Sequence, residues 1–348
     1  MPHDIFGTRI VAAPMAGGTS TPAFVKAVHD AGGLGFLAAG YRTVAGMQEE
    51  IRSARAAGAR FGMNVFVPGP HQGAPSAAVR AQLEAYRAQL RPDALRYGVE
   101  LPPLRLEDDD DWHGKVDSLV ADPVELVSFT FGLPGTDVVR ALQRAGSTVL
   151  ATVTTVAEAL EAAGQGVDAL VVQHSCAGAH SAAFQPSAAV HDNGRDDSLP
   201  GTTAELVALV RAAVGLPLLA AGGVMDRAGL AEVLAAGAQA AQLGTVFLRT
   251  DESGARQLHK DALGSPRFTE TRLTRAFTGR AARALVNEFV RDHPGAPEAY
   301  PAVHHLTAPL RAAAAAAGDA ERLNLWAGTG WQQARTGSVA EVVAALVG

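Results

Sequence analysis

The chain of 348 residues lacks the features that mark several classes of protein. It has a single cysteine, Cys176, which excludes an intramolecular disulfide and predicts a reducing compartment, the cytoplasm. No apolar run approaches the roughly 20 residues of a membrane-spanning helix, and the first residues lack the positive charge of a signal peptide. The 29 basic residues form no cluster and are outnumbered by 35 acidic ones. We therefore expect neither a membrane nor a nucleic acid as a partner.

Glycine, in contrast, is abundant. Glycine accounts for 37 of the 348 residues, a fraction well above the roughly 7% that is usual in proteins. In a chain of mixed strands and helices, such an excess indicates many tight turns and close approach of the backbone to a ligand. Since α/β barrels use roughly 250 residues for one core, the length leaves room for a barrel and an additional region.

Short apolar runs alternate with amphipathic, alanine-rich stretches, which predicts strands and helices in turn. The predicted strands are Ile10–Ala13, Leu34–Ala38, Phe61–Val67, Leu126–Thr130, Thr148–Val153, Ala169–Val172, Leu218–Ala221 and Ala240–Leu243. The predicted helices between them are Pro22–Ala31, Val44–Ala57, Asp137–Ala145, Val156–Ala163, Thr203–Val214 and Arg227–Ala236. Continuous apolar strands are typical of a parallel sheet that is covered on both faces. A closed barrel and a doubly wound open sheet both fit this succession. Eight units without a Gly-x-Gly-x-x-Gly after the first strand favour an α/β fold of the (β/α)8 TIM-barrel class.

Two segments fall outside this repeat. Pro68–Gly114 contains a predicted helix at Ser76–Leu90 and an acidic run, Glu107–Asp111, that we expect to be a solvated loop. From Ser265 onward no strand is evident, and the predicted helices are Thr269–Val290, Leu306–Ala317 and Val339–Val347. We interpret 1–70 with 115–264 as the barrel. Residues 71–114 with 265–348 are then a smaller, mainly helical cap that contributes the substrate region.

Function in a βα barrel belongs to the loops that follow the strands, and the last two commonly bind phosphate. Here these loops are Ala221-Gly222-Gly223-Val224 and Gln242-Leu243-Gly244-Thr245. Glycine allows backbone N–H groups to approach an anion, and the next helix adds a favourable dipole. Gly-Gly is also a plain turn, but the two loops together predict a phosphate-bearing ligand.

The loop after the sixth strand runs from Gln173 to His180 and places an amide, two imidazoles and a thiol at the barrel mouth. The histidines His174, His180, His191 and the pair His304-His305 show no spacing typical of a zinc site. We therefore expect no metal. The acidic pair Asp196-Asp197 is expected to lie in a loop or to cap the helix at Thr203.

Several motifs, in order along nearly the whole chain, resemble those of nitronate monooxygenases. They are Ala13-Pro14-Met15-Ala16-Gly17-Gly18, Gly32-Gly33-Leu34-Gly35, Gly62-Met63-Asn64-Val65, Gln173 to His180, Ala221-Gly222-Gly223, Gln242-Leu243-Gly244-Thr245, Phe277-Thr278-Gly279-Arg280-Ala281-Ala282-Arg283 and Leu325-Trp326-Ala327-Gly328. Members of that family are FMN-dependent barrels that oxidise alkyl nitronates with dioxygen to a carbonyl compound and nitrite. The resemblance implies FMN as the cofactor, a nitronate or nitroalkane and O2 as substrates, and is compatible with a homodimer.

The resemblance also implies roles for individual residues. His180 matches the active-site histidine. The positions expected at FMN are Met15, Asn64, Gln173, Gly178, Gly222, Gly223, Gln242, Leu243, Gly244 and Thr245.

The sixth-strand motif departs from the family pattern Gln-Gly-x-Glu-Ala-Gly-Gly-His-Arg-Gly. His174 replaces the first glycine, Cys176 the glutamate, Ala179 the glycine before the histidine and Ser181-Ala182 the Arg-Gly. Thr329 stands where a glutamine is common. Flavin binding is expected to survive, while the substrate side is expected to diverge.

Three other functions remain open from the sequence. A related FMN-dependent enoyl-[acyl-carrier-protein] reductase shares the barrel and a histidine in the same loop. Cys176 could act as a nucleophile, as in barrels similar to IMP dehydrogenase, although their extended glycine-rich stretch is absent. The chain could also bind flavin without turnover.

Overall fold

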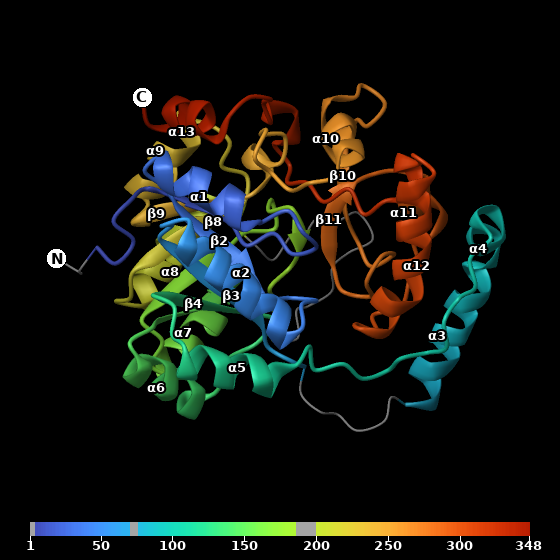
Figure 1. Cartoon of the computed structure of the whole chain (residues 1–348), viewed down its shortest axis with the longest axis horizontal. Coiled ribbons are helices and arrows are strands. Elements are labelled where there is room, and N and C mark those ends of the chain that lie inside the picture. Colours follow the sequence, from blue (N-terminus) through green and yellow to red (C-terminus); the bar gives the residue numbers. More distant parts are fainter. Residues whose placement is uncertain (1–3, 70–75, 186–199) are drawn as a thin grey trace.

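The computed structural model describes residues 4–69, 76–185 and 200–348. Eight parallel strands close into a barrel in the order β1-β2-β3-β4-β5-β6-β8-β9, in which β9 pairs with β1 (Figure 1). They are β1 (Ile10–Ala12), β2 (Leu34–Ala38), β3 (Phe61–Phe66), β4 (Leu126–Thr130), β5 (Thr148–Val153), β6 (Ala169–Gln173), β8 (Leu218–Ala221) and β9 (Ala240–Leu243). The predicted TIM barrel is confirmed.

Helices surround this barrel. They are α1 (Pro22–Asp30), α2 (Val44–Ala56), α5 (Trp112–Ala121), α6 (Thr136–Ala145), α7 (Val156–Gly164), α8 (Thr203–Ala213), α9 (Arg227–Ala235) and α13 (Val339–Val347), with the short 3₁₀ turn η1 (Thr245–Phe247) after β9. Helix α5 was not expected from the sequence, and its Trp112 and Leu119 are buried. The last helix, α13, packs against α1 and α9.

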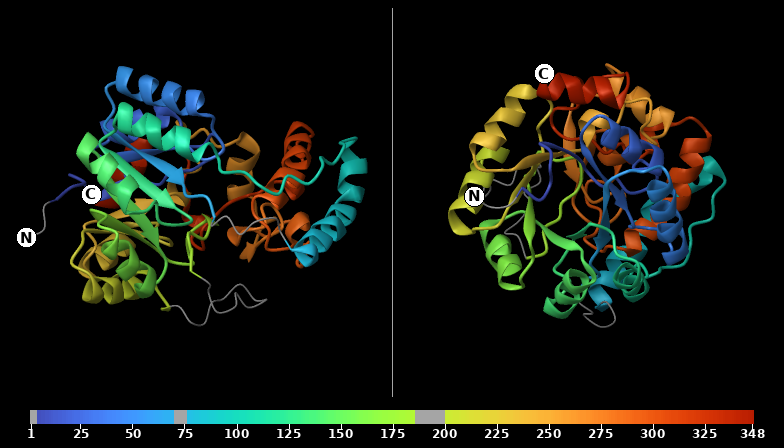
Figure 2. Two further views of the ribbon diagram at one scale, coloured as in Figure 1. Left: turned by 90° about the horizontal axis from the view of Figure 1, so that it is seen from below. Right: turned by 60° about the vertical axis from the view of Figure 1, so that its left-hand side comes forward.

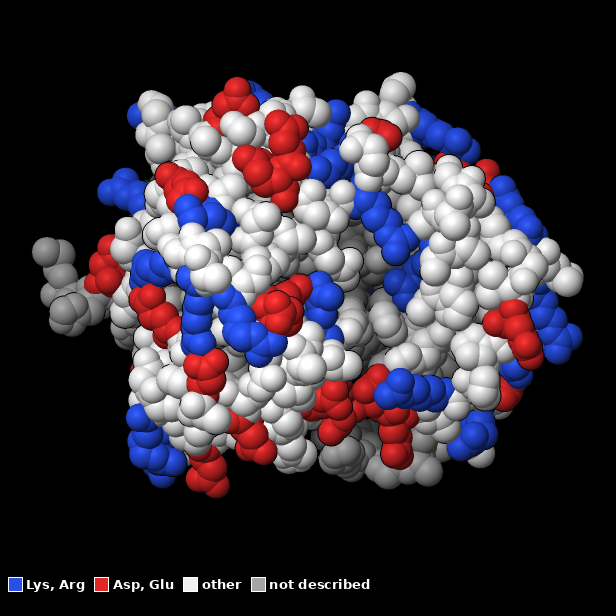
Figure 3. All heavy atoms as spheres, viewed as in Figure 1, with Lys and Arg blue, Asp and Glu red and all other residues white. Residues whose placement is uncertain are grey.

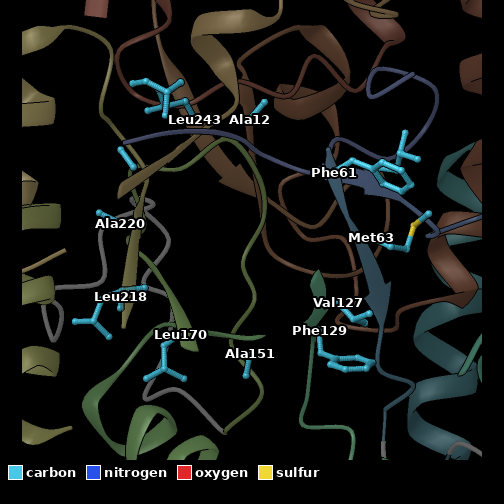
Figure 4. Close-up of a cluster of buried hydrophobic side chains, with 14 of the residues drawn as sticks. Ala12, Phe61, Met63, Val127, Phe129, Ala151, Leu170, Leu218, Ala220 and Leu243 are labelled. Carbon is cyan, nitrogen blue, oxygen red and sulfur yellow. The ribbon is translucent and has the colours of Figure 1, made fainter. Parts of the chain in front are cut away.

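Successive strand residues divide the core into two layers. Leu126 and Leu150 belong to the cluster inside the barrel. Their neighbours Val127 and Ala151 belong to the cluster between the barrel and its helices, which Figure 4 shows in part. This alternation explains why the strands are apolar along their whole length.

A second body stands at one end of the barrel (Figures 1 and 2). Its elements are α3 (Ala77–Gln89), α4 (Arg91–Tyr97), α10 (Gln257–Gly264), α11 (Glu288–Asp292), α12 (Ala302–Ala316), the 3₁₀ turns η2 (Ala320–Arg322) and η3 (Trp331–Gln333), and a three-stranded sheet. That sheet has the order β10 (Thr271–Thr274), β11 (Ala282–Leu285) and β7 (Ala179–His180), and its pairings are antiparallel. Both α3 and α4 pack on α12, although the barrel strands lie between them in sequence. The boundaries 1–70 with 115–264 and 71–114 with 265–348 stay a prediction.

The predicted helix Thr269–Val290 is wrong. That segment contains β10, β11 and only the short helix α11. Gly279, between the two strands, has a φ of +79°, and a Cβ there would lie 2.7 Å from the Ala299 carbonyl carbon. The turn therefore requires glycine, and pairing of β11 with β7 overrides the local helical propensity. The predicted helix Leu306–Ala317 exists but begins earlier, at Ala302.

The acidic run Glu107–Asp111 is only partly solvated. Asp108 contacts His305 Nε2 at 2.9 Å, and Asp110 forms an ion pair of 2.8 Å with the fully buried Lys115. Asp110 also accepts a hydrogen bond from the Tyr41 backbone N–H. The solvated-loop prediction is therefore wrong for these two carboxylates, which join the segment to α12 and to the β2–α2 loop. No helix in the described ranges is long and apolar enough to cross a membrane.

Candidate active site

The loop after β6 brings His180 to the edge of the three-stranded sheet. His180 pairs with Ala282 of β11, so this loop is fixed by a strand that lies about 100 residues later in the chain. Gln173, at the end of β6, fixes the same loop from the other side. Its Nε2 donates to the His180 carbonyl at 3.1 Å and its Oε1 accepts from the Ala182 N–H at 2.8 Å. The backbone of His180 is thus held at two points.

The His180 ring lies in an apolar and cationic environment. Its Nε2 lies 2.9 Å from the Oγ1 of the buried Thr278. The rings of Phe131, Tyr300 and Trp326 lie 5.5, 6.1 and 5.4 Å away between centroids. Burial, followed by the charges of two arginines described below, lowers the pKa of His180 to about 3. The ring is therefore neutral near pH 7.

Two glycines after β8 bring the backbone close to this loop. Gly222 and Gly223 have φ values of +111° and +71°, which residues with a side chain rarely adopt. A Cβ at Gly222 would lie 2.9 Å from the Ala177 N–H nitrogen, and one at Gly223 would lie 3.2 Å from the Cys176 Cβ. Only glycine allows this approach between the β8 loop and the β6 loop.

The end of β9 offers a polar atom without a partner. Gln242 Oε1 is buried and has no hydrogen-bond partner among the described residues. The hydroxyl of Thr245 accepts from the Gly328 N–H at 3.0 Å. Met15 Sδ lies 3.7 Å from where a Gly244 Cβ would be, so the first and last strand loops meet here. Leu243 places its side chain in the core, and its carbonyl accepts from the Ala13 N–H at 2.8 Å.

Asn64 and Gly178 are held from different sides of the barrel mouth. Asn64 is buried in β3 and donates its amide hydrogens to Ser128 and Thr130. Its amide oxygen is the atom left for a ligand. A Cβ on Gly178 would lie 2.7 Å from the Gly328 nitrogen, so glycine permits close packing of these two loops.

The second histidine of the loop, His174, does not share the setting of His180. Its Nε2 contacts the Pro200 carbonyl at 2.7 Å, and its Nδ1 accepts from the Cys176 N–H at 3.2 Å. With both ring nitrogens occupied, it is a weaker candidate for catalysis than His180. The imidazole lowers the pKa of the Cys176 thiol. Among the described residues no cluster of histidine, cysteine or carboxylate could hold a metal. His191 and Asp196-Asp197 lie outside those residues.

Six residues near His180 received no role from the sequence. Tyr41 stacks on His304 with ring centroids 4.2 Å apart, and Arg280 lies 4.0 Å over the Phe131 ring. The other two are Tyr300 and Arg311, which come from the segment around α12. Tyr41 and Phe131 follow β2 and β4, so their place at strand ends was a usable signal. The α12 residues gave none, because nothing local indicates that α12 returns to the barrel mouth.

The space-filling view shows a hollow between the barrel and the body that carries α11 and α12, with lysine or arginine side chains along it (Figure 3). Comparisons with known proteins identify the family of this chain. A family model described as nitronate monooxygenase matches residues 3–348. A probable nitronate monooxygenase of Staphylococcus aureus (strain MSSA476) is 33% identical over 344 residues, which cover 97% of this chain and 93% of that protein. One from Staphylococcus haemolyticus is 34% identical, with coverages of 97% and 92%.

Solved structures extend the comparison. The nitroalkane oxidase from Streptomyces ansochromogenes is 48% identical, with a TM-score of 0.91 and coverages of 99% of this chain and 95% of that one. FabK from Thermotoga maritima is 23% identical with a TM-score of 0.73 and coverages of 98% and 92%, which shows a shared fold. On these matches and on the arrangement of its loops, the chain belongs to the nitronate monooxygenase family of oxidoreductases.

Proposed function

We propose that this enzyme oxidises alkyl nitronates with O2, in an FMN-dependent reaction that yields a carbonyl compound and nitrite. The observation that carries the proposal is a neutral, partly accessible His180 on the β6 loop, which packs against the glycines after β8. Nitro-compound oxidation is the chemistry of the family and of the nitroalkane oxidase that this chain resembles.

The residues of the barrel mouth fit FMN. Gly222, Gly223 and Gly244 with Thr245 would hold its phosphate, since their backbone N–H groups are free of a covering Cβ. The unpartnered Gln242 Oε1 would accept from an N–H of the isoalloxazine ring. The remaining residues proposed at the cofactor are Met15, Asn64, Gln173, Gly178 and Leu243. FMN would accept electrons from the nitronate and pass them to O2.

His180 acts here as a neutral hydrogen-bonding group. In one arrangement the Thr278 hydroxyl donates to the Arg280 carbonyl at 3.3 Å and accepts the Nε2–H of His180. This leaves Nδ1 with a lone pair, and no described residue occupies it. A ring whose pKa is about 3 is a weak base. We therefore expect preformed nitronates, which have already lost their proton, to react faster than neutral nitroalkanes.

The test begins with the absorbance spectrum of the purified protein and continues with anaerobic addition of an alkyl nitronate. Bleaching of flavin bands by the nitronate, followed by nitrite release in air without NAD(P)H, is the expected result. His180→Asn should retain the flavin and lower nitronate turnover by about 10-fold, as expected for a lost hydrogen bond and not for a lost base. NADH-dependent reduction of an enoyl thioester without nitrite would instead assign a reductase. A flavoprotein whose flavin is reduced neither by the nitronate nor by NADH would support a binding role.

The cellular location and the oligomeric state are part of the same proposal. The single thiol, Cys176, suits a cytoplasmic location. The assembly proposed is a homodimer, which light scattering on the purified protein would test.

A further inference from the structure

Two arginines beside His180 have no carboxylate partner at ion-pair distance among the described residues. Arg280 lies in the turn between β10 and β11, and Arg311 lies on α12. Neither forms any of the ion pairs found in the described part of the chain. Arg322 shows the usual alternative, since its guanidinium contacts Asp93, Glu288 and Asp292. An inward-facing guanidinium without such a partner is costly unless another anion binds to it.

Both guanidinium groups are held at one end and free at the other. Arg280 donates from Nε to the Ser181 carbonyl at 3.2 Å and from Nη2 to the Ala183 carbonyl at 2.5 Å. Arg311 donates from Nε to Thr307 Oγ1 at 3.2 Å and from Nη2 to the Nδ1 and carbonyl of His304. In each arginine, Nη1 donates to no described residue. Neither Nη1 belongs to the fully buried polar atoms that lack a partner. These donors are preorganised and available.

The two groups face one region. Arg280 lies over the Phe131 ring, whose centroid is 5.5 Å from that of His180. Arg311 Nη2 lies 3.3 Å from Nδ1 of His304, and the His304 ring stacks on Tyr41. The charges of both guanidinium groups act to lower the pKa of His180. Burial lowers the pKa of each arginine to about 10, so both remain charged near pH 7.

The carboxylates that act on this region at longer range are already engaged. Asp110 is paired with Lys115, and Glu298 is paired with Arg275. Glu158 accepts hydrogen bonds from Thr154, Phe184 and Gln185. The described residues thus leave a positive region beside a neutral histidine.

We propose that Arg280 and Arg311 form the anion-binding part of this site, and that they hold the negatively charged oxygens of the substrate. The substrate class is a compound with a small, planar oxyanion head, which in the proposed function is the nitronate group. The Nη1 group of each arginine would donate to one oxygen, so that the two arginines together suit two oxygens on one atom. The assignment rests on the proposed function for the identity of that anion, but not for the existence of the anion site.

Sodium nitrate tests the site without turnover, because nitrate is a planar oxyanion that cannot be oxidised. Calorimetric titration of the purified flavoprotein should show saturable binding of nitrate that an alkyl nitronate displaces. Arg311→Gln and Arg280→Gln should each weaken nitrate about 10- to 100-fold, as expected for a lost charge-assisted hydrogen bond. Arg311→Lys should bind with intermediate affinity. Arg275→Gln, which removes a guanidinium already paired with Glu298, should bind like the unaltered protein. Circular dichroism would verify the fold of each variant.

The kinetic arm separates this inference from the proposed function. In Arg311→Gln the KM for a nitronate should rise about 10-fold or more, while the KM for the neutral nitroalkane changes little. Arginine-dependent nitrate binding without nitrite release from any nitronate would sustain the anion site and overturn the proposed function. Nitrate binding and nitronate KM that are unchanged in both Gln variants would overturn the anion site and leave the proposed function standing.

Discussion

The hydroxyl of Thr278 orients the His180 ring, because it is the hydrogen-bond partner of Nε2 at 2.9 Å. Replacing Thr278 with valine keeps the shape and removes this partner. We expect kcat/KM for a nitronate to fall about 3- to 10-fold, the value of one ordinary hydrogen bond. Thr278→Ser should restore the rate, as measured by nitrite release. Equal losses in both variants would show that shape, rather than the hydroxyl, matters.

The proposed role of the Gly223 loop in binding FMN can be tested by adding a methyl group at this position. Gly223→Ala adds a Cβ at a φ of +71° and 3.2 Å from the Cys176 Cβ. We expect less FMN per protein after purification, measured from the flavin and protein absorbance. Gly166→Ala is the matched control, since Gly166 has a φ of +84° and nothing within 4 Å of the new Cβ. It should share the backbone strain and retain its flavin. Full flavin occupancy in Gly223→Ala would contradict the assignment of this loop.

Among the elements outside the barrel, α4, α11 and η2 are joined by one ion network around Asp93. Asp93 lies 2.6 Å from Arg322 Nε and 3.3 Å from His293 Nε2, and all three side chains are buried. Asp93→Ala leaves a buried guanidinium and should cost roughly 3–5 kcal/mol of unfolding free energy. Asp292→Ala removes a more exposed partner of the same arginine and should cost less than about 1 kcal/mol. Urea unfolding would measure both, and similar losses would contradict this ranking.

The barrel elements could be predicted closely because their patterns are local. Each of the eight strands lies within one residue of its predicted bounds at either end, since a strand buried on both faces is an uninterrupted apolar run. The segment Thr269–Val290 could not be predicted, because its strands depend on pairing with β7. The site divides in the same way. Loops after strands located His180 and the glycines, whereas Arg311 and Tyr300 meet His180 only through the packing of α12.

At the scale of the whole molecule, three inward-facing histidines couple stability to pH. Burial is the main cause that lowers the pKa of His180, His259 and His304 to about 3, 4 and 2. The unfolded chain has the ordinary value of about 6.5 for each. As the pH falls below about 6.5, these histidines bind protons in the unfolded state but remain neutral in the folded state. The contribution of the three neutral histidines to the free energy of unfolding is therefore complete above about pH 6.5. It is lost as the pH falls from there to the pKa of each histidine in the folded state.

For His259 alone, this loss amounts to something on the order of 2 kcal/mol by about pH 5. Its Nε2 contacts the Trp326 carbonyl at 3.0 Å, and His259→Gln would supply an amide N–H in its place. We expect unfolding free energies of the unaltered protein to drop between about pH 7.5 and about pH 5, and the drop to be smaller in His259→Gln. Parallel pH profiles of the two proteins would contradict a neutral His259.

The contact of α13 with α1 and α9 has a consequence for how the protein is made. The ribosome synthesises α13 after every other described element. The faces of α1 and α9 that α13 covers therefore stay exposed until a helix some 100 to 300 residues downstream has been made. Until then the nascent barrel has an apolar seam, which α13 closes with Val339, Val342, Val343 and Leu346. Unfinished barrels with such seams are the species that chaperones bind and that aggregate. Covering of this seam is therefore expected only after α13 has emerged from the ribosome, when all the barrel strands have already been synthesised.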